Sequence, residues 1–289
     1  MPRLGAHLSA AGGAWRAVES ARSCGCEALQ LFQRAPGRWA AAAFVEEDAV
    51  RFRGAARTAG LDGLCFAHAP YLLNLASDDR TLRERSIAVL VEELQRGGRL
   101  GLAGVVLHPG SGGKGDRASA EARCRAAVSE AVDRAGNGAA TLLLEGQAGS
   151  GGQLGRTPTE LAQLVDPELR SAAQGGRRPR VGVCLDSAHL WGAGYDLLGD
   201  GWERVLGELA DSWQLEAPQL FHGNDTAVEL GSHRDRHAPP GDGKLGRKFF
   251  SKLLHDRRCT DMPVVLEIPP GEDNALVKKA LARLRRWAR

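Results

Sequence analysis

Eight short apolar runs, starting about 25 to 45 residues apart, limit most strongly the folds open to this chain. They occupy Arg3–His7, Ala28–Phe32, Leu64–His68, Gly104–His108, Thr141–Glu145, Val181–Asp186, Pro218–His222 and Pro263–Glu267. Most are rich in Val, Leu or Phe, and none alternates strictly between apolar and polar residues. Runs of this kind are typical of strands buried on both faces, so the sequence predicts a parallel sheet.

Segments with helical character separate these runs, so each run begins one βα unit. Eight such units in 289 residues predict a (β/α)8 TIM barrel that forms a single domain over residues 1–289. A doubly wound open sheet is the alternative, but Leu8–Gly13 after the first run lacks the GxGxxG spacing usual there. Helices are expected at Ala14–Arg22, Val45–Thr58, Arg80–Leu100, Trp202–Trp213, Lys244–Leu254 and Asn274–Trp287.

The composition is that of a globular protein, with 43% hydrophobic and 25% charged residues. A net charge of +3 is too small to indicate a dedicated nucleic-acid-binding tail. No apolar run approaches the roughly 18 residues that span a bilayer, and the N-terminal segment does not resemble a signal peptide. The six cysteines include no CxxC pair, which is typical of reduced thiols. We therefore expect a cytoplasmic protein that binds no membrane.

Polar side chains end the predicted strands, where a barrel of this type places its chemistry. The strand ends are His7, Phe32-Gln33, His68, His108, Glu145, Asp186, His222 and Glu267. Asp186 and His189 are three residues apart, so they share a face on a first helical turn. Asp235 and His237 are two apart, so in an extended loop both side chains point the same way. Any one of these residues alone is more often a hydrogen-bonded or capping group, but together they predict a site.

Leaving His7 aside, five histidines, two aspartates and two glutamates converge on one rim. So many partly buried acids and bases need compensating positive charge, which two or three divalent metal ions supply. Imidazole and carboxylate ligands favour Zn²⁺, Mn²⁺ or Fe²⁺ over Ca²⁺ or Mg²⁺. Sites with several metals suit displacement at phosphorus, so the pattern predicts a metal-dependent phosphoesterase or nuclease. A sugar isomerase or epimerase with metals on the same barrel stays open.

Several longer motifs then resemble the endonuclease IV family of abasic-site endonucleases. These motifs are Gly5–Gly13, His68–Leu75, His108–Ser111, Gly182–His189, Ala193–Asp196, His222–Asp225, Asp235–His237 and Leu266–Glu267. The resemblance runs in order from about residue 3 to 287. It implies a TIM barrel with three zinc ions, with Mn²⁺ or Fe²⁺ open at one site.

By the same resemblance, the first zinc would be held by His68, His108 and Glu145, which are also the implied catalytic residues. The second would be held by Glu145, Asp186, His222 and Glu267, and the third by His189, Asp235 and His237. The implied reaction is attack by zinc-bound hydroxide on the phosphate 5′ to an abasic deoxyribose, which leaves a 3′-hydroxyl and a 5′-deoxyribose phosphate. Trimming of blocked 3′ ends is implied too, and the partner would be double-stranded DNA with either kind of damage. A repair enzyme that bends DNA implies a monomer as the default state.

The implied DNA contacts are Tyr71, Leu72, Gln33, Arg34, Arg38, His7 and Asn224. The chain departs from the family pattern after the second strand, where Ala35 and Gly37 replace an Asn and an Arg, and after Glu145, where Gly146-Gln147 replaces Asn-Thr. The basic run Arg177–Arg180 precedes a strand, so we expect it at the opposite end of the barrel. A non-catalytic lesion-binding protein remains a further alternative, although such a protein has no need for nine converging ligands.

Overall fold

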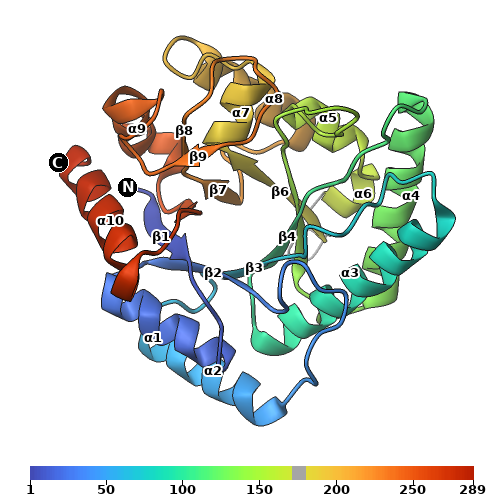
Figure 1. Ribbon diagram of the computed structural model, residues 1–289, viewed down its shortest axis with the longest axis horizontal. Helices are drawn as coiled ribbons and strands as arrows, with labels where there is room; N and C mark the ends of the chain where they lie inside the picture. Colours follow the sequence, from blue (N-terminus) through green and yellow to red (C-terminus); the bar gives the residue numbers. More distant parts are fainter. Residues whose placement is uncertain (171–179) are drawn as a thin grey trace.

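The computed structural model describes residues 1–170 and 180–289 and contains a closed barrel of parallel strands in the order β1-β10-β7-β6-β5-β4-β3-β2 (Figure 1). The barrel strands are β1 (Arg3–His7), β2 (Ala28–Phe32), β3 (Cys65–His68), β4 (Gly104–Leu107), β5 (Thr141–Glu145), β6 (Val181–Asp186), β7 (Leu220–His222) and β10 (Pro263–Leu266). Each predicted run contains one of these strands, so the predicted (β/α)8 barrel is confirmed.

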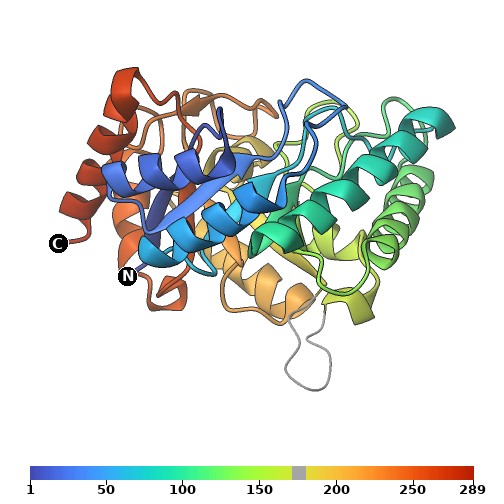
Figure 2. The ribbon, with the colours of Figure 1, turned by 90° about the horizontal axis from the view of Figure 1, so that it is seen from below.

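Helices surround the barrel on its outer side (Figures 1 and 2). They are α1 (Ala14–Cys24), α2 (Glu46–Thr58), α3 (Arg80–Leu100), α4 (Arg117–Ala135), α5 (Pro158–Gln163), α6 (Pro167–Arg170), α7 (Ser187–Ala193), α8 (Gly201–Trp213), α9 (Gly246–His255) and α10 (Ala275–Trp287), with short 3₁₀ turns η1 (Arg257–Cys259) and η2 (Glu272–Asn274). The predicted α3 has the right bounds because it is capped at both ends. Asp79 accepts the backbone N–H groups of Thr81 and Leu82, and Gly101 ends the helix with a left-handed φ of 75°. No helix in the described ranges is both long and apolar enough to cross a membrane.

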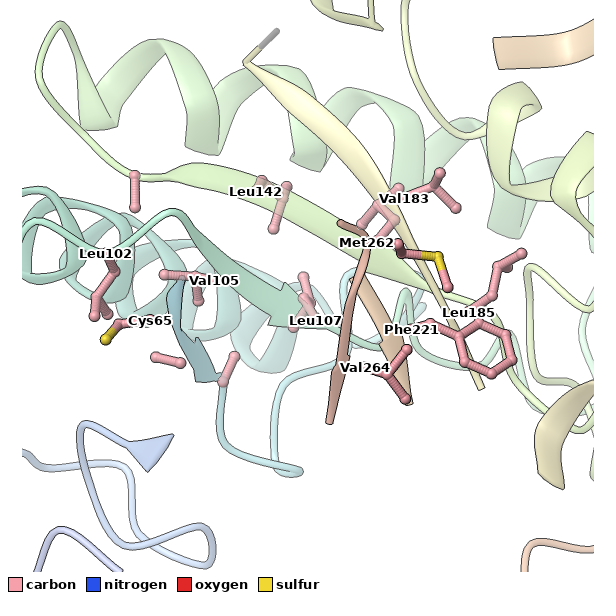
Figure 3. Packing of buried hydrophobic residues seen from close by; sticks show 14 of the residues in the cluster. Cys65, Leu102, Val105, Leu107, Leu142, Val183, Leu185, Phe221, Met262 and Val264 are labelled. Atoms are coloured by element: carbon pink, nitrogen blue, oxygen red, sulfur yellow. The ribbon is translucent and has the colours of Figure 1, made fainter. Parts of the chain in front are cut away.

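The main hydrophobic core lies between the barrel and its helices. Outward-facing strand residues such as Val105, Leu142 and Val183 belong to it and are fully buried (Figure 3). A second, smaller cluster consists of residues that face the barrel interior. Its members are Ala28, Phe66, Val106, Leu143, Cys184, Leu220 and Val265. Both faces of the strands are therefore buried, which explains why no run alternates between apolar and polar residues.

The next inward-facing position on each strand, two residues further along, is polar. On the seven strands that supply the inner cluster, these positions are Gln30, His68, His108, Glu145, Asp186, His222 and Glu267. On β1 the pairing of Gly5 with Ala28 and of His7 with Gln30 places His7 in the same ring. An apolar plug thus fills the barrel, and a ring of polar side chains lies on it at the carboxyl ends of the strands.

A two-stranded antiparallel sheet joins β8 (Asp225–Thr226) to β9 (His237–Ala238) and brings His237 back towards the barrel. Asp225 is fully buried, and its carboxylate accepts five backbone N–H groups at 2.8 to 3.1 Å, those of Thr226, Gly241, Gly243, Leu245 and Gly246. This single carboxylate therefore holds the loop that follows His237.

The predicted basic run at the opposite end of the barrel falls mostly on residues 177–179, which lie outside the described residues. Arg180 is described, and its guanidinium donates to the Asp133 carboxylate at 2.9 Å and to the Val132 carbonyl at 2.6 Å. Arg180 is therefore bound to the end of α4.

Candidate metal centre

Three groups of potential metal ligands lie side by side at the polar ring, with ligand atoms within 4.8 Å of one another in each group. The groups are His68, His108 and Glu145; Glu145, Asp186, His222 and Glu267; and Asp186, His189 and His237. Glu145 belongs to the first two groups and Asp186 to the last two. The structure therefore brings eight of the nine predicted ligands into three linked groups.

Glu145 is fully buried at the end of β5 and presents one carboxylate oxygen to each of two groups. Its Oε2 lies 3.1 Å from His68 Nε2 and 3.0 Å from His108 Nε2. Its Oε1 lies 3.0 Å from His222 Nδ1. This is the arrangement of a carboxylate that bridges two metal ions.

The third group differs in one member from the prediction, which assigned Asp235 to it. The structural group contains Asp186 in that place. Asp235 is nevertheless close, with carboxylate oxygens 3.2 Å from His189 Nε2 and 3.0 Å from His237 Nε2. Its side chain is 51% exposed, so it closes the group from the solvent side.

Backbone carbonyl groups fix which imidazole nitrogen faces the site. His68 Nδ1 lies 2.6 Å from the Ala69 carbonyl, and His189 Nδ1 lies 2.8 Å from that of Gly146. Each Nδ1–H is thereby used, which leaves Nε2 for a metal. Gly146, where the chain departs from the family pattern, thus supports a ligand through its backbone.

Two nitrogen atoms test whether these residues suit a metal. Among the described residues, His108 Nε2 and His237 Nε2 are buried without a hydrogen-bond partner, although each is 3.0 Å from a carboxylate oxygen. A lone pair directed at a cation explains such an atom, because a nitrogen that coordinates a metal donates no hydrogen bond. Imidazole nitrogen and carboxylate oxygen ligands suit zinc and related ions.

Electrostatics in the absence of metal favours protonated imidazoles. Burial alone would lower the pKa of His237, but Asp186 and Asp235 raise it to about 9. Burial would also lower the pKa of His189, but Asp186 and Asp235 raise it well above its ordinary value. Protons on the histidines thus take the place of the cations that the carboxylates require.

We expect the metal-free protein to lose stability between about pH 6.5 and 9, whereas the zinc-loaded protein keeps it. A histidine whose pKa is raised on folding stabilises fully below its unfolded pKa of about 6.5, and this contribution disappears as the pH passes the folded pKa. For His237 alone the loss is on the order of 3 kcal/mol. Thermal melts of chelator-treated and reloaded protein across this range measure it. Parallel pH profiles for the two forms would contradict the assignment of these histidines as ligands.

The predicted DNA contacts divide into exposed and buried residues. Tyr71 is 62% exposed beside the metal centre, and its ring contacts those of Phe32 and His68 edge-on at centroid distances of 5.6 and 5.3 Å. Arg38 is exposed and Leu72 is half-buried. These three side chains are placed where a DNA duplex could reach them.

The other four predicted contacts are engaged inside the protein. The Arg34 guanidinium, 1% exposed, binds Glu93 and Glu92 of α3, and Gln33 donates to Glu93 as well. Asn224 is fully buried. Its Nδ2 donates to Asp186 at 2.6 Å, and its Oδ1 accepts the Glu267 N–H. The ring of His7 contacts Gln30.

Arg34 and Asn224 are the two predicted DNA contacts whose side chains are buried in the structure. The Arg34 guanidinium binds two glutamates and a backbone carbonyl, and the Asn224 amide donates to Asp186 and accepts the Glu267 N–H. Gln33 and His7 retain partial exposure at the rim. The predicted contacts with exposed side-chain surface therefore form a smaller set than the seven expected from the sequence.

Two cavities open at this rim and share Tyr71 and Glu267. One, of about 520 Å³, lies over the ligands and is lined by His68, Tyr71, His108, Gln153, His189, Asp235, Arg236, His237 and Glu267. The other, of about 650 Å³, is lined mainly by the loops after β1 and β2, including Ala35 and Pro36. A Cβ atom added at Gly37 would meet nothing within 4 Å, so the missing family side chain leaves open space there.

Sequence reasoning missed two buried residues of the site. Gln30, on β2, makes hydrogen bonds with two of the predicted metal ligands. Asp225 holds the loop after β9. Gln30 carries a detectable signal, because it is the polar residue two positions after the inward-facing Ala28. Asp225 carries no comparable signal, since its partners are backbone groups up to 21 residues away.

Comparisons with known proteins agree with this geometry. The xylose isomerase-like TIM barrel family matches residues 18–287. The chain is 40% identical to a probable endonuclease 4 of Nitratidesulfovibrio vulgaris over 100% of both chains, and 42% identical to one of Oleidesulfovibrio alaskensis over 99% of this chain and 95% of that one. The crystal structure of endonuclease IV from Thermus thermophilus superposes with a TM-score of 0.84 at 34% identity, over 99% of this chain and 98% of that one. The chain therefore belongs to the endonuclease IV family of xylose isomerase-like TIM barrels.

Proposed function

We propose that this protein is a zinc-dependent DNA repair endonuclease that cleaves the phosphodiester 5′ to abasic sites and also trims blocked 3′ ends. The observation that carries the proposal is the chain of shared carboxylates, in which Glu145 and Asp186 link three ligand groups beside the exposed Tyr71. The predicted cofactor is three Zn²⁺ ions, with Mn²⁺ or Fe²⁺ open at one site. The proposed partner is double-stranded DNA that carries an abasic site or a blocked 3′ end.

The chain's own residues set the geometry of this reaction. Glu145 holds the first two ligand groups at a fixed separation, because its two oxygens face different histidines at about 3 Å. His68 and His108 lie between Glu145 and Tyr71, so they border the cavity in which a phosphodiester would lie. Bound zinc would supply the nucleophile at neutral pH and neutralise charge on the phosphate. Asp235 and His237 close the cavity from the loop side.

Single-turnover cleavage of a duplex with one stable abasic analogue tests the proposal. We expect incision directly 5′ to the analogue, with a 3′-hydroxyl product, and little cleavage of the intact duplex. A folded, zinc-loaded protein that does not cut would exclude the proposed reaction. Tight lesion binding without cleavage would instead favour a binding protein, and turnover of a free sugar would favour an epimerase. The solved structure of a D-tagatose 3-epimerase-like protein, 16% identical, shares the fold with this chain at a TM-score of 0.68.

We expect Tyr71→Ala to weaken binding to abasic DNA more than to intact duplex. The aromatic ring is exposed beside the ligands, and stacking of one base on such a ring contributes about 1–3 kcal/mol. The expected loss is therefore roughly 5- to 150-fold for the damaged duplex. Fluorescence anisotropy with both duplexes measures it, and Val50→Ala, an exposed apolar residue of α2, is the control. Equal losses on both duplexes would show that Tyr71 does not recognise the lesion.

A further inference from the structure

Gln30 is the one amide in the polar ring, and all of its hydrogen-bonding capacity faces other members of that ring. The residue lies in the middle of β2 and is fully buried. Its Nε2 donates to Glu267 Oε1 at 2.7 Å and lies 3.0 Å from His7 Nδ1. Its Oε1 lies 2.9 Å from His222 Nε2. The amide therefore joins two predicted ligands from β7 and the end of β10.

The orientation of this amide is fixed by its neighbours. Glu267 Oε1 can only accept a hydrogen bond, so the Gln30 NH₂ group must face it. The carbonyl oxygen of Gln30 then faces His222 Nε2, and that nitrogen must donate. A flipped amide would place two acceptor oxygens against each other and two donors against each other. The hydrogen bonds thus assign the proton of His222 to Nε2.

The consequence is that the opposite nitrogen of His222 faces the metal centre. His222 Nδ1 lies 3.0 Å from Glu145 Oε1 and 3.2 Å from Glu267 Oε2. This polarity is the reverse of that at His68 and His189, where backbone carbonyls hold Nδ1 and leave Nε2 free. Gln30 also occupies Glu267 Oε1, so Oε2 is the oxygen left for a metal.

We propose that Gln30 is a positioning residue for the metal held by Glu145, Asp186, His222 and Glu267. It selects Nδ1 of His222 and Oε2 of Glu267 as the ligand atoms of that group. Within the polar ring of the barrel, its only contact outside this group is with His7, which belongs to none of the three ligand groups. The role of Gln30 is therefore confined to one of the three metal groups. The inference rests on the proposed metal centre but not on the identity of the DNA substrate.

Zinc binding to the Gln30→Met variant tests this role without any DNA. Methionine keeps the approximate volume at this buried position and removes the polar contacts with Glu267, His7 and His222. Loss of such an outer partner weakens metal binding by about 10- to 100-fold. We expect that loss for one zinc equivalent and unchanged affinity for the other two, in competition titrations with a chromophoric chelator. Metal content after dialysis against limiting chelator should fall from three equivalents to two.

A matched control is Gln219→Ala, which removes a glutamine whose Oε1 accepts the Val183 N–H outside the ligand groups. This variant should retain all three equivalents. If Gln30→Met does not fold, Gln30→Glu provides the same test, since its carboxylate still accepts from His222 but repels Glu267. Undiminished binding of all equivalents, or an equal loss at all of them, would overturn the role of Gln30. If Gln30→Met loses affinity for one zinc equivalent as expected but the parent protein cuts no abasic DNA, the role of Gln30 stands and the proposed function is rejected.

Discussion

Glu145→Gln is expected to lower the single-turnover rate of incision by about 10³-fold or more, while the protein stays folded. The substitution removes the charge of the carboxylate shared by two ligand groups. It also places an NH₂ group against either the His68/His108 pair or His222, because only one of its two terminal atoms remains an acceptor. Metal ions contribute several kcal/mol of charge stabilisation to reactions of this kind, and each 1.4 kcal/mol is tenfold in rate.

Rate and metal content should be measured on the same preparation of Glu145→Gln. We expect fewer than three zinc equivalents together with an unchanged circular dichroism spectrum. Glu160→Gln is the matched control, because Glu160 is a partly buried glutamate of α5 that pairs with Arg117 and Arg156. Its incision rate should stay close to that of the parent protein. A near-normal rate for Glu145→Gln with three bound ions would exclude Glu145 as the bridging ligand.

The barrel and most of its ligands could be predicted because the signal lies in the strands themselves. Strands buried on both faces appear as apolar runs, and in a parallel barrel their polar carboxyl ends meet on one rim. The apolar run that ends at Glu145 is therefore enough to predict that this side chain lies on the rim. The end of the run at Asp186 is equally informative, since Asp186 also caps α7 and so accepts the His189 N–H.

Other parts of the site depend on contacts that leave no local pattern. Gln30 lies between Leu29 and Leu31, so in the sequence it belongs to an apolar run, although the inward-facing alternation of the barrel assigns it to the polar ring. The placement of Asp235 and His237 beside His189 depends on the path of the loop between β8 and β9. Strands of two residues have no periodicity from which that path could be inferred.

Arg34 has structural partners that the sequence alone does not indicate. In sequence it is one cation in a loop expected to touch DNA, and Glu93 lies 59 residues away. In the structure, Arg34 Nε is 2.5 Å from Glu93 Oε1 and its Nη2 is 2.8 Å from Glu92 Oε2. Its Nη1 also donates to the Trp39 carbonyl. The guanidinium therefore fastens the loop after β2 to α3, and it neutralises a glutamate with no exposure to solvent.

Arg34→Met is accordingly expected to destabilise the protein by about 3–5 kcal/mol, the usual cost of leaving one member of a buried ion pair without its partner. The melting temperature should fall by roughly 5–15 °C. Burial already raises the pKa of Glu93, and loss of Arg34 raises it further, so the carboxyl takes up a proton at low pH. The deficit should therefore grow as the pH rises through about 4.5, because Glu93 then ionises in the unfolded chain but stays protonated in the folded variant.

The double variant Arg34→Met/Glu93→Leu should recover much of the lost stability, because an apolar pair can replace a buried ion pair at little cost. Arg38→Met separates this role from DNA binding, since Arg38 is exposed in the same loop. If Arg38 contacts a phosphate, its removal reduces the slope of log affinity against log salt concentration by about 0.9 and leaves the melting temperature unchanged. Arg34→Met should show the opposite pattern, a lower melting temperature with the same salt slope. A reduced salt slope and normal stability for Arg34→Met would mean that this arginine leaves Glu93 to bind DNA.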